Sequence, residues 1–353
     1  MIEKQNPHTQ SSGSMNDLRL HKASVVLTGD RPTGKLHLGH YVGSLVSRLE
    51  LQKEHSQIIL IADTQALTDN ANNPAKVSAN ISEVLLDYLA VGIDPRTNTI
   101  FLQSHVPELF EISAYLSNLV TLARLERNPT VKEEIKQKGF ERRIPVGFLT
   151  YPISQAADIV AFRTTHVPVG DDQLPMLELC NEIVDSFNRT YNTDVLQRCA
   201  PILSECSRLP GLDGKAKMSK SLGNAIYLAD TNEEIARKVS RMYTDPKHVR
   251  VEDPGHLEGN VVFEYLEHFD KDHVGLRDLK ENYTRGGIAD SLVKRRLANA
   301  LIDLIEPIRR RREELQRDPA YLEQVLQEGT ERARTVAANT LREVRDAIGI
   351  NRF

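Results

Sequence analysis

Residues 24–40, SVVLTGDRPTGKLHLGH, decide the fold, because they join a short apolar run through a glycine-bearing turn to the start of a helix. The β-branched run at 25–27 predicts a buried strand that ends at Gly29. After the turn, apolar side chains recur at helical spacing: Leu38, Val42, Leu45 and Leu49. A strand that leads into a helix in this way indicates an α/β fold, and the amides at such a helix start can bind an anion.

The same alternation continues along the chain. Apolar runs at 58–62 and 99–102 predict two further strands, and the first of them is apolar enough to be buried on both faces. Each is followed by a helical stripe, the first at Val77, Ile81, Val84 and Tyr88, the second at Leu109, Ile112, Leu116 and Leu119. Strands that alternate with helices predict a parallel sheet whose ligands bind at the carboxyl ends of the strands. We therefore predict a Rossmann-like catalytic domain over residues 23–230.

The two ends of the chain differ from this pattern. Residues 231–353 predict an all-helical second domain, with arginine clusters that include 309–312. A solvated helix face is the more common role of such a cluster. Residues 1–22 are polar and lack apolar periodicity, which predicts a disordered extension, and Met15 could be the true first residue.

Composition excludes several classes of protein. The chain has 353 residues, 40% of them hydrophobic, and no apolar run long enough to span a membrane as a helix. Its net charge of −4 gives no overall nucleic-acid signature. The three cysteines form no CxxC pair, which argues against a disulfide framework or a cysteine-rich zinc site and favours a reducing cytoplasm.

The first glycine turn carries two histidines, His37 and His40, at the helix start. The turn lacks the lysine of a phosphate-binding P-loop and the glycine spacing of a dinucleotide fold. The histidines could simply cap and pack the helix. They could also donate hydrogen bonds to a triphosphate as charge develops on it.

A second glycine-bearing stretch, LPGLDGKAKMSKS at 209–221, contains three lysines among small polar residues. Lysine-rich loops are usually solvated surface loops. The alternative is a loop that binds a departing diphosphate. The presence of both stretches in one chain favours that second interpretation.

Together the two stretches resemble the class I aminoacyl-tRNA synthetases. Residues 32–40 are similar to that class's HIGH signature, and residues 217–221 match its KMSKS signature letter for letter. Further stretches look like the tryptophanyl-tRNA synthetase family: LER at 125–127, YPISQAAD at 151–158, VPVGDDQ at 167–173, LAVGIDP at 89–95 and the helical tail. The resemblance covers essentially all of residues 24–353.

The resemblance implies a set of site residues. Catalytic roles would belong to His37, His40, Lys217 and Lys220. ATP would contact those two lysines and His40, together with Arg31, Pro32, Thr33, Gly39, Gly170, Asp171, Asp172, Leu209, Met218, Ser219 and Ser221. The amino acid would contact Asp158, Tyr151, Gln173 and Gln65, the last of which stands where many bacterial members have histidine.

Asp158 has the right chemistry to select tryptophan. An indole N–H only donates, so a carboxylate is a suitable partner. Two alanines precede Asp158, and Ile159 and Val160 follow it, an apolar setting in which a lone charge needs a reason.

The implied function is that of a tryptophan–tRNA ligase. It would use ATP with Mg²⁺ on the phosphates, no metal site of its own, tRNA(Trp) as acceptor, and a homodimer. The helical domain would read the anticodon, and the cluster at 309–312 would be a candidate phosphate contact. Two alternatives stay open: a tyrosyl-tRNA synthetase, and a synthetase-like protein that binds an adenylate or a partner without charging tRNA.

Overall fold

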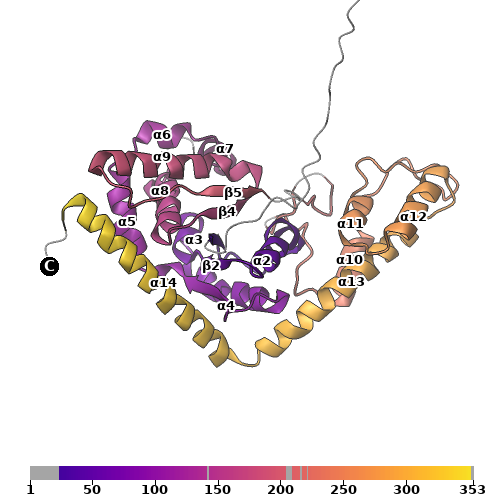
Figure 1. Ribbon diagram of the computed structural model, residues 1–353. Helices are drawn as coiled ribbons and strands as arrows, with labels where there is room; N and C mark the ends of the chain where they lie inside the picture. The colour runs from indigo at the N-terminus through magenta and orange to yellow at the C-terminus, as the bar shows by residue number, and fades with distance from the viewer. Residues whose placement is uncertain (1–23, 141–142, 204–208, 215–216, 221, 351–353) are drawn as a thin grey trace, which may run out of the picture.

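The computed structural model describes residues 24–140, 143–203, 209–214, 217–220 and 222–350. The expected extension at 1–22, Ser221 and Cys206 lie outside the described residues. Strands and helices alternate through the first part of the chain, and helices follow in the second (Figure 1).

A five-stranded sheet forms the centre of the first part, with the strand order β3-β2-β1-β4-β5. All the strand pairs are parallel. The strands are β1 (Val25–Asp30), β2 (Ser56–Ile61), β3 (Asn98–Leu102), β4 (His166–Val169) and β5 (Ala200–Leu203). The predicted parallel sheet is therefore confirmed. From β1, the strands β2 and β3 lie on one side and β4 and β5 on the other, and α/β sheets bind ligands at such a switch point.

Helices connect and cover these strands. They are α1 (Leu38–His40), the π-helical turn η2 (Tyr41–Leu45), α2 (Val46–Leu51), α3 (Asp63–Asn70), α4 (Pro74–Val91), η3 (Gln103–His105), α5 (Glu108–Ser117), α6 (Leu122–Arg127), α7 (Pro129–Lys138), α8 (Val146–Ala161), η4 (Asp171–Gln173) and α9 (Leu174–Tyr191). The later helices are α10 (Asn232–Ser240), α11 (Val261–Phe269), α12 (His273–Arg285), α13 (Asp290–Leu315) and α14 (Pro319–Ile348).

Successive residues of β2 enter two different cores, as the twofold period of a strand requires. Ile59 and Ile61 pack with α4 in a core that continues into α10–α13. Ile58 and Leu60 pack with α5, α8 and α9. The expected burial of this strand on both faces is confirmed.

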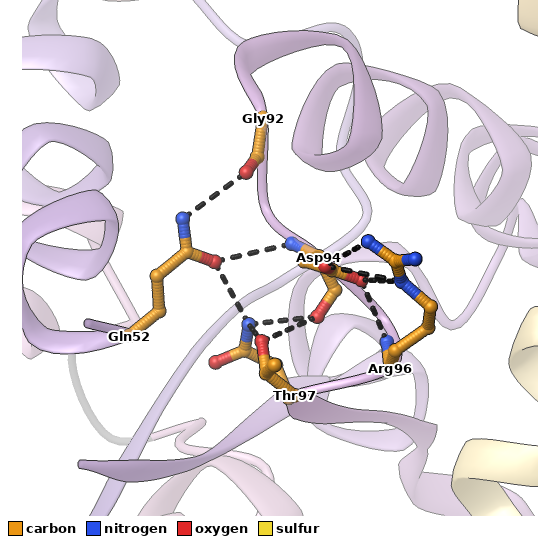
Figure 2. A network of polar contacts seen from close by, with 6 residues as sticks. Gln52, Gly92, Asp94, Arg96 and Thr97 are labelled. Atoms are coloured by element: carbon orange, nitrogen blue, oxygen red, sulfur yellow. Dashed lines mark hydrogen bonds and ion pairs between the residues drawn. The ribbon is translucent and has the colours of Figure 1, made fainter. Parts of the chain in front are cut away.

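The stretch LAVGIDP, which carries part of the family resemblance, has a structural role (Figure 2). Gly92 ends α4 in a left-handed conformation, with φ of 111°. The Gln52 side chain donates to the Gly92 carbonyl over 3.1 Å and accepts from the Asp94 N–H over 3.1 Å. These bonds fix the chain between α4 and β3 on the side of the sheet away from the strands' carboxyl ends.

The C-terminal region consists of helices with one long interruption, and its last helix turns back to the sheet domain. Residues 241–260 form turns rather than a helix, because Pro246, Pro254, Gly255 and Gly259 interrupt the helical pattern. Helices α13 and α14 form a V, and α14 returns to lie beside β3 and α5 (Figure 1). The helices at 231–353 therefore do not form one separate bundle.

Gly329 allows α14 to approach the edge strand closely. A Cβ on Gly329 would lie 1.8 Å from the carbonyl oxygen of Ile100. The next residue, Thr330, accepts a hydrogen bond from the Leu102 N–H over 3.2 Å. The helix thus covers a strand edge that would otherwise be open to pairing with another chain.

We expect Gly329→Ala to lower the melting temperature, with a loss of about 2 kcal/mol in the free energy of unfolding. The added methyl group meets backbone that cannot move aside, and this outweighs the helix propensity of alanine. Thermal unfolding of Gly329→Ala beside Glu323→Ala, an exposed change on the same helix, measures the effect. Equal melting temperatures for the two variants would contradict it.

Candidate active site

The first glycine turn connects the end of β1 to the helical run that begins at Leu38. His37 caps this run, and its Nδ1 accepts from the Gly39 N–H over 3.1 Å. The Nδ1 of His40 accepts from the His37 N–H over 3.3 Å. Because both Nδ1 atoms accept, the hydrogen-bonding pattern assigns the proton of each neutral ring to Nε2.

Both rings are neutral at physiological pH. Burial lowers the pKa of His37 to about 2, with further lowering by His40 and Lys220. Burial also lowers the pKa of His40 to about 4, although Asp30 acts in the opposite direction. The two imidazoles can therefore act as neutral N–H donors rather than as cations.

The KMSKS stretch lies directly against this turn. The Lys220 ammonium donates to the Gly34 carbonyl over 2.7 Å. The Sδ of Met218 accepts from the Gly39 N–H over 3.3 Å, across 179 positions of sequence. Burial lowers the pKa of Lys220 to about 8, while Asp30 and Asp87 favour its charged form.

Asn224, which was not predicted from the sequence, forms hydrogen bonds that hold the KMSKS stretch in place. Its Oδ1 accepts from the Ser219 N–H over 2.8 Å, and its Nδ2 donates to Asp213 over 3.1 Å. A Cβ on Gly211 would lie 2.0 Å from that Nδ2. The asparagine follows the motif by only a few residues, and that proximity was the one signal available.

Asp30, at the end of β1, is a second residue that the sequence analysis missed. Its carboxylate accepts from the Tyr88 hydroxyl over 2.7 Å and pairs with Arg48 over 2.9 Å. Burial acts to raise the pKa of Asp30, but Arg48 and His40 outweigh it and lower the pKa to about 2. A permanent negative charge therefore lies beside the two histidines and Lys220.

Asp158 is buried on α8, with 1% of its surface exposed. Its Oδ2 accepts from the Gln103 side chain over 2.8 Å, while its buried Oδ1 has no partner in the described part of the chain. Burial raises the pKa of Asp158 to about 7, although the bond from Gln103 favours the carboxylate. An unpaired buried oxygen is costly, so this atom is suited to accept from a ligand's N–H group.

Gln103 connects Asp158 to Gln65 and was also missed. Its Oε1 accepts from the Gln65 N–H over 3.1 Å. Gln103 follows β3 directly, and a polar residue at the carboxyl end of a strand was the available signal.

Tyr151 lies on α8, seven positions before Asp158. Its hydroxyl donates to Glu134 over 2.9 Å. Burial and then Glu134 raise the pKa of Tyr151 well above its usual range, and Arg31 is close enough to oppose this. Arg31 itself pairs with Asp69 over 2.8 Å.

The GDDQ stretch begins where β4 ends. Gly170 starts the short helix η4, and its carbonyl accepts from the Gln173 N–H over 3.0 Å. The Thr130 hydroxyl fixes the Asp172 carbonyl over 2.8 Å. Asp171 and Asp172 are exposed, as carboxylates that meet an incoming ligand would be.

The other predicted residues differ in exposure. Arg31 and Lys217 are exposed, Thr33 is half-buried, and Pro32 is buried. The side chains of Leu209 and Met218 are buried in the core. The Leu209 carbonyl accepts from the Met218 N–H over 3.2 Å, which joins the two ends of the KMSKS loop.

The arginine cluster at 309–312 is not one solvated face, which corrects that interpretation. Arg309 and Arg310 pair with glutamates of their own helix, over 2.6 and 2.5 Å. Arg312 points the other way, is 5% exposed and pairs with Asp87 on α4 over 2.8 Å. Arg312 is therefore a packing residue between helices.

Comparison with known proteins agrees with this geometry. Residues 19–306 match the family of class I tRNA synthetases for tryptophan and tyrosine. The chain is 58% identical to a tryptophan–tRNA ligase of Clostridium longisporum over 93% of this chain and 98% of the relative. It is 56% identical to one of Streptococcus pyogenes over 93% and 99% of the two chains.

Solved structures give the same assignment. The tryptophanyl-tRNA synthetase of Campylobacter jejuni, complexed with ADP and tryptophan, superposes with a TM-score of 0.81 at 29% identity, over 92% of this chain and 99% of that one. In the described part of this chain, no helix combines the length and apolarity needed to cross a membrane. The chain belongs to the class I tRNA synthetases for tryptophan and tyrosine, and within that family to the tryptophan–tRNA ligases.

Proposed function

We propose that this chain activates L-tryptophan with ATP and transfers it to tRNA(Trp). Its relatives are named tryptophan–tRNA ligases, which supports the choice of amino acid and acceptor. The observation that carries the choice of amino acid is Asp158, whose buried Oδ1 has no hydrogen-bond partner among the residues that the structure describes. An indole N–H would satisfy that oxygen, whereas a buried carboxylate left unpaired is costly.

In the first step, the tryptophan carboxylate attacks the α-phosphorus of ATP, and the bond to the diphosphate breaks. The products are tryptophanyl-adenylate and diphosphate. Nε2–H groups of His37 and His40 would donate to the phosphates, and Lys220 and Lys217 would stabilise the departing diphosphate. The protein contributes positions and charges rather than covalent chemistry.

The remaining residues would hold the two substrates. Residues Arg31 to Thr33, Gly39, Leu209 and the stretch 217–221 would lie along the nucleotide, with Gly170, Asp171 and Asp172 at adenosine. Tyr151, Gln173 and Gln65 would face the amino acid together with Asp158. The Campylobacter jejuni relative was solved with ADP and tryptophan, which supports binding of both ligand types by this chain.

Mg²⁺ would enter bound to the ATP phosphates, since this ion keeps several waters and prefers substrate oxygens to protein cages. When bound, it would neutralise phosphate charge during the attack. The residues of both motifs offer hydrogen-bond donors and cations, which fit a phosphate chain that brings its own metal.

In the second step, a ribose hydroxyl of the terminal tRNA adenosine attacks the activated carbonyl and releases AMP. The 2′-hydroxyl is the expected nucleophile. We propose that residues 231–353 contact the anticodon region, that the enzyme works as a homodimer, and that it acts in the cytoplasm, where tRNA is charged.

Exchange of labelled diphosphate into ATP tests the proposal, with tryptophan, with tyrosine and with neither. We expect exchange with tryptophan alone. Exchange with tyrosine would change the choice of amino acid and keep the reaction. Binding of indole without exchange would instead support a protein that has kept the fold and lost the chemistry. Because the chain contains no tryptophan, indole fluorescence reports binding directly.

A further inference from the structure

A buried ion pair joins the helical region to the sheet domain next to the active site. Arg312 on α13 is 5% exposed, and Asp87 on α4 is fully buried. The Nε of Arg312 donates to Oδ1 of Asp87 over 2.8 Å. Arg312 also pairs with Glu83, one helical turn before Asp87.

The second oxygen of Asp87 reaches the first glycine turn. Its Oδ2 accepts from the Leu36 N–H over 2.7 Å. Leu36 immediately precedes His37 in the chain. One carboxylate therefore binds α13 with one oxygen and the phosphate-binding turn with the other.

The opposite side of the same turn is held by the chain that follows KMSKS. The Leu38 N–H donates to the Ile226 carbonyl over 2.9 Å, and the Leu228 N–H donates to the Leu36 carbonyl over 3.1 Å. The residues on either side of His37 are thus fixed between the Asp87–Arg312 pair and residues 226–228.

Stability alone is a weak reason for such a pair. Two apolar residues of similar volume are often as stabilising as a buried ion pair, because burying the charges is costly. The pair does offer fixed geometry, since the guanidinium and the carboxylate each bond in defined directions. Fixed geometry matters most beside groups that must meet a transition state.

We propose that Asp87 and Arg312 are positioning residues for adenylate formation, which set the place of the first glycine turn relative to helix α13. This rests on the proposed function. The pair acts through Leu36 and His37. The charge of Asp87 also favours the charged form of Lys220, so the Arg312 variants, which keep that charge, are the test of position alone. The position of the helical region is thereby coupled to the phosphate-binding groups.

Three variants test this: Asp87→Asn, Arg312→Met and Arg312→Lys. Asparagine has one acceptor oxygen for two donors, and methionine removes the guanidinium while filling its space. We expect the rate of diphosphate exchange at saturating substrates to fall about 10-fold with Asp87→Asn or Arg312→Met. The KM for tryptophan should stay unchanged, and Arg312→Lys should recover part of the rate.

The matched control is Arg345→Met. Arg345 pairs with Glu111 through two bonds, of 2.7 and 2.6 Å, and so joins α14 to α5 far from both motifs. Arg345→Met should lower the melting temperature and leave the rate of diphosphate exchange unchanged. If the Asp87 and Arg312 variants behave like this control, the pair is only structural and the proposal is overturned.

Hydrogen–deuterium exchange of the peptide that contains residues 35–40 gives a readout without catalysis. We expect faster exchange there in Arg312→Met than in the parent or in Arg345→Met, although Arg312 does not touch that peptide's backbone. Unchanged protection would overturn the coupling whatever the activity. A parent without diphosphate exchange would count against the proposed function, and the deuterium result would still decide this inference.

Discussion

Replacement of Lys220 by alanine should lower tryptophan-dependent exchange of diphosphate into ATP by about 100-fold or more. Tryptophan binding should hardly change, because the Lys220 ammonium contacts the glycine turn at Gly34 and not the Asp158 side of the site. Loss of rate with intact substrate binding is the signature of a group that acts mainly in the transition state. Rapid-quench measurement of adenylate formation, beside a fluorescence titration with tryptophan, checks both parts.

The dependence of kcat/KM on pH tests whether the charged form of Lys220 is the active form. With a pKa of about 8 in the free enzyme, Lys220 is charged below that pH and loses its charge above it. We therefore expect kcat/KM for ATP to fall as the pH rises through about 8. In Lys220→Arg this alkaline decline should disappear, because arginine stays protonated.

Lys247→Ala is the matched control, since Lys247 is an exposed lysine in the turns before α11. It should exchange at the parent's rate. Equal rates in the parent and in Lys220→Ala would remove Lys220 from the mechanism. An alkaline decline that persists in Lys220→Arg would assign the titration to another group.

Local sequence patterns were sufficient to predict strands β1 to β3 and the two motifs that surround the site. The apolar runs at 25–27, 58–62 and 99–102 all form parallel strands, although β2 ends one residue before Ala62. The two glycine-bearing stretches, which were predicted to share a ligand, lie in contact. These features depend on periodicity and on motifs that are each contained in one stretch of chain. The short strands β4 and β5 have no such pattern, and neither was predicted, although residues 167–173 were singled out through the family resemblance.

The supporting residues could not be predicted, because their roles depend on partners far away in sequence. Asp87 and Arg312 are 225 positions apart. Within α13, Arg312 continues the helical spacing of the buried residues Leu301, Ile305 and Ile308, so periodicity alone places it on the inner face. That pattern does not identify Asp87 on α4 as its partner. Likewise, the return of α14 to β3 depends on the backbone of Ile100 at Gly329, which no periodicity in the helix records.

Asp158→Asn should weaken tryptophan binding by about 10- to 100-fold. The site presents two donors to this side chain, the Gln103 amide and the indole N–H, and the carboxylate has an oxygen for each. An asparagine has only one oxygen, and its amide group would face the other donor. Fluorescence titration of tryptophan into the protein, which has no tryptophan of its own, measures the loss.

Two further readouts separate this role of Asp158 from general damage to the pocket. In the parent, tryptophan affinity should fall as the pH drops through about 7, because protonation of the carboxyl removes an acceptor. In the asparagine variant the affinity should be independent of pH in that range. The parent should also reject the benzothiophene analogue of tryptophan, which lacks the N–H, far more strongly than the variant does. If parent and variant discriminate equally, the indole N–H bonds elsewhere, and Asp158 then serves the fold and not the choice of amino acid.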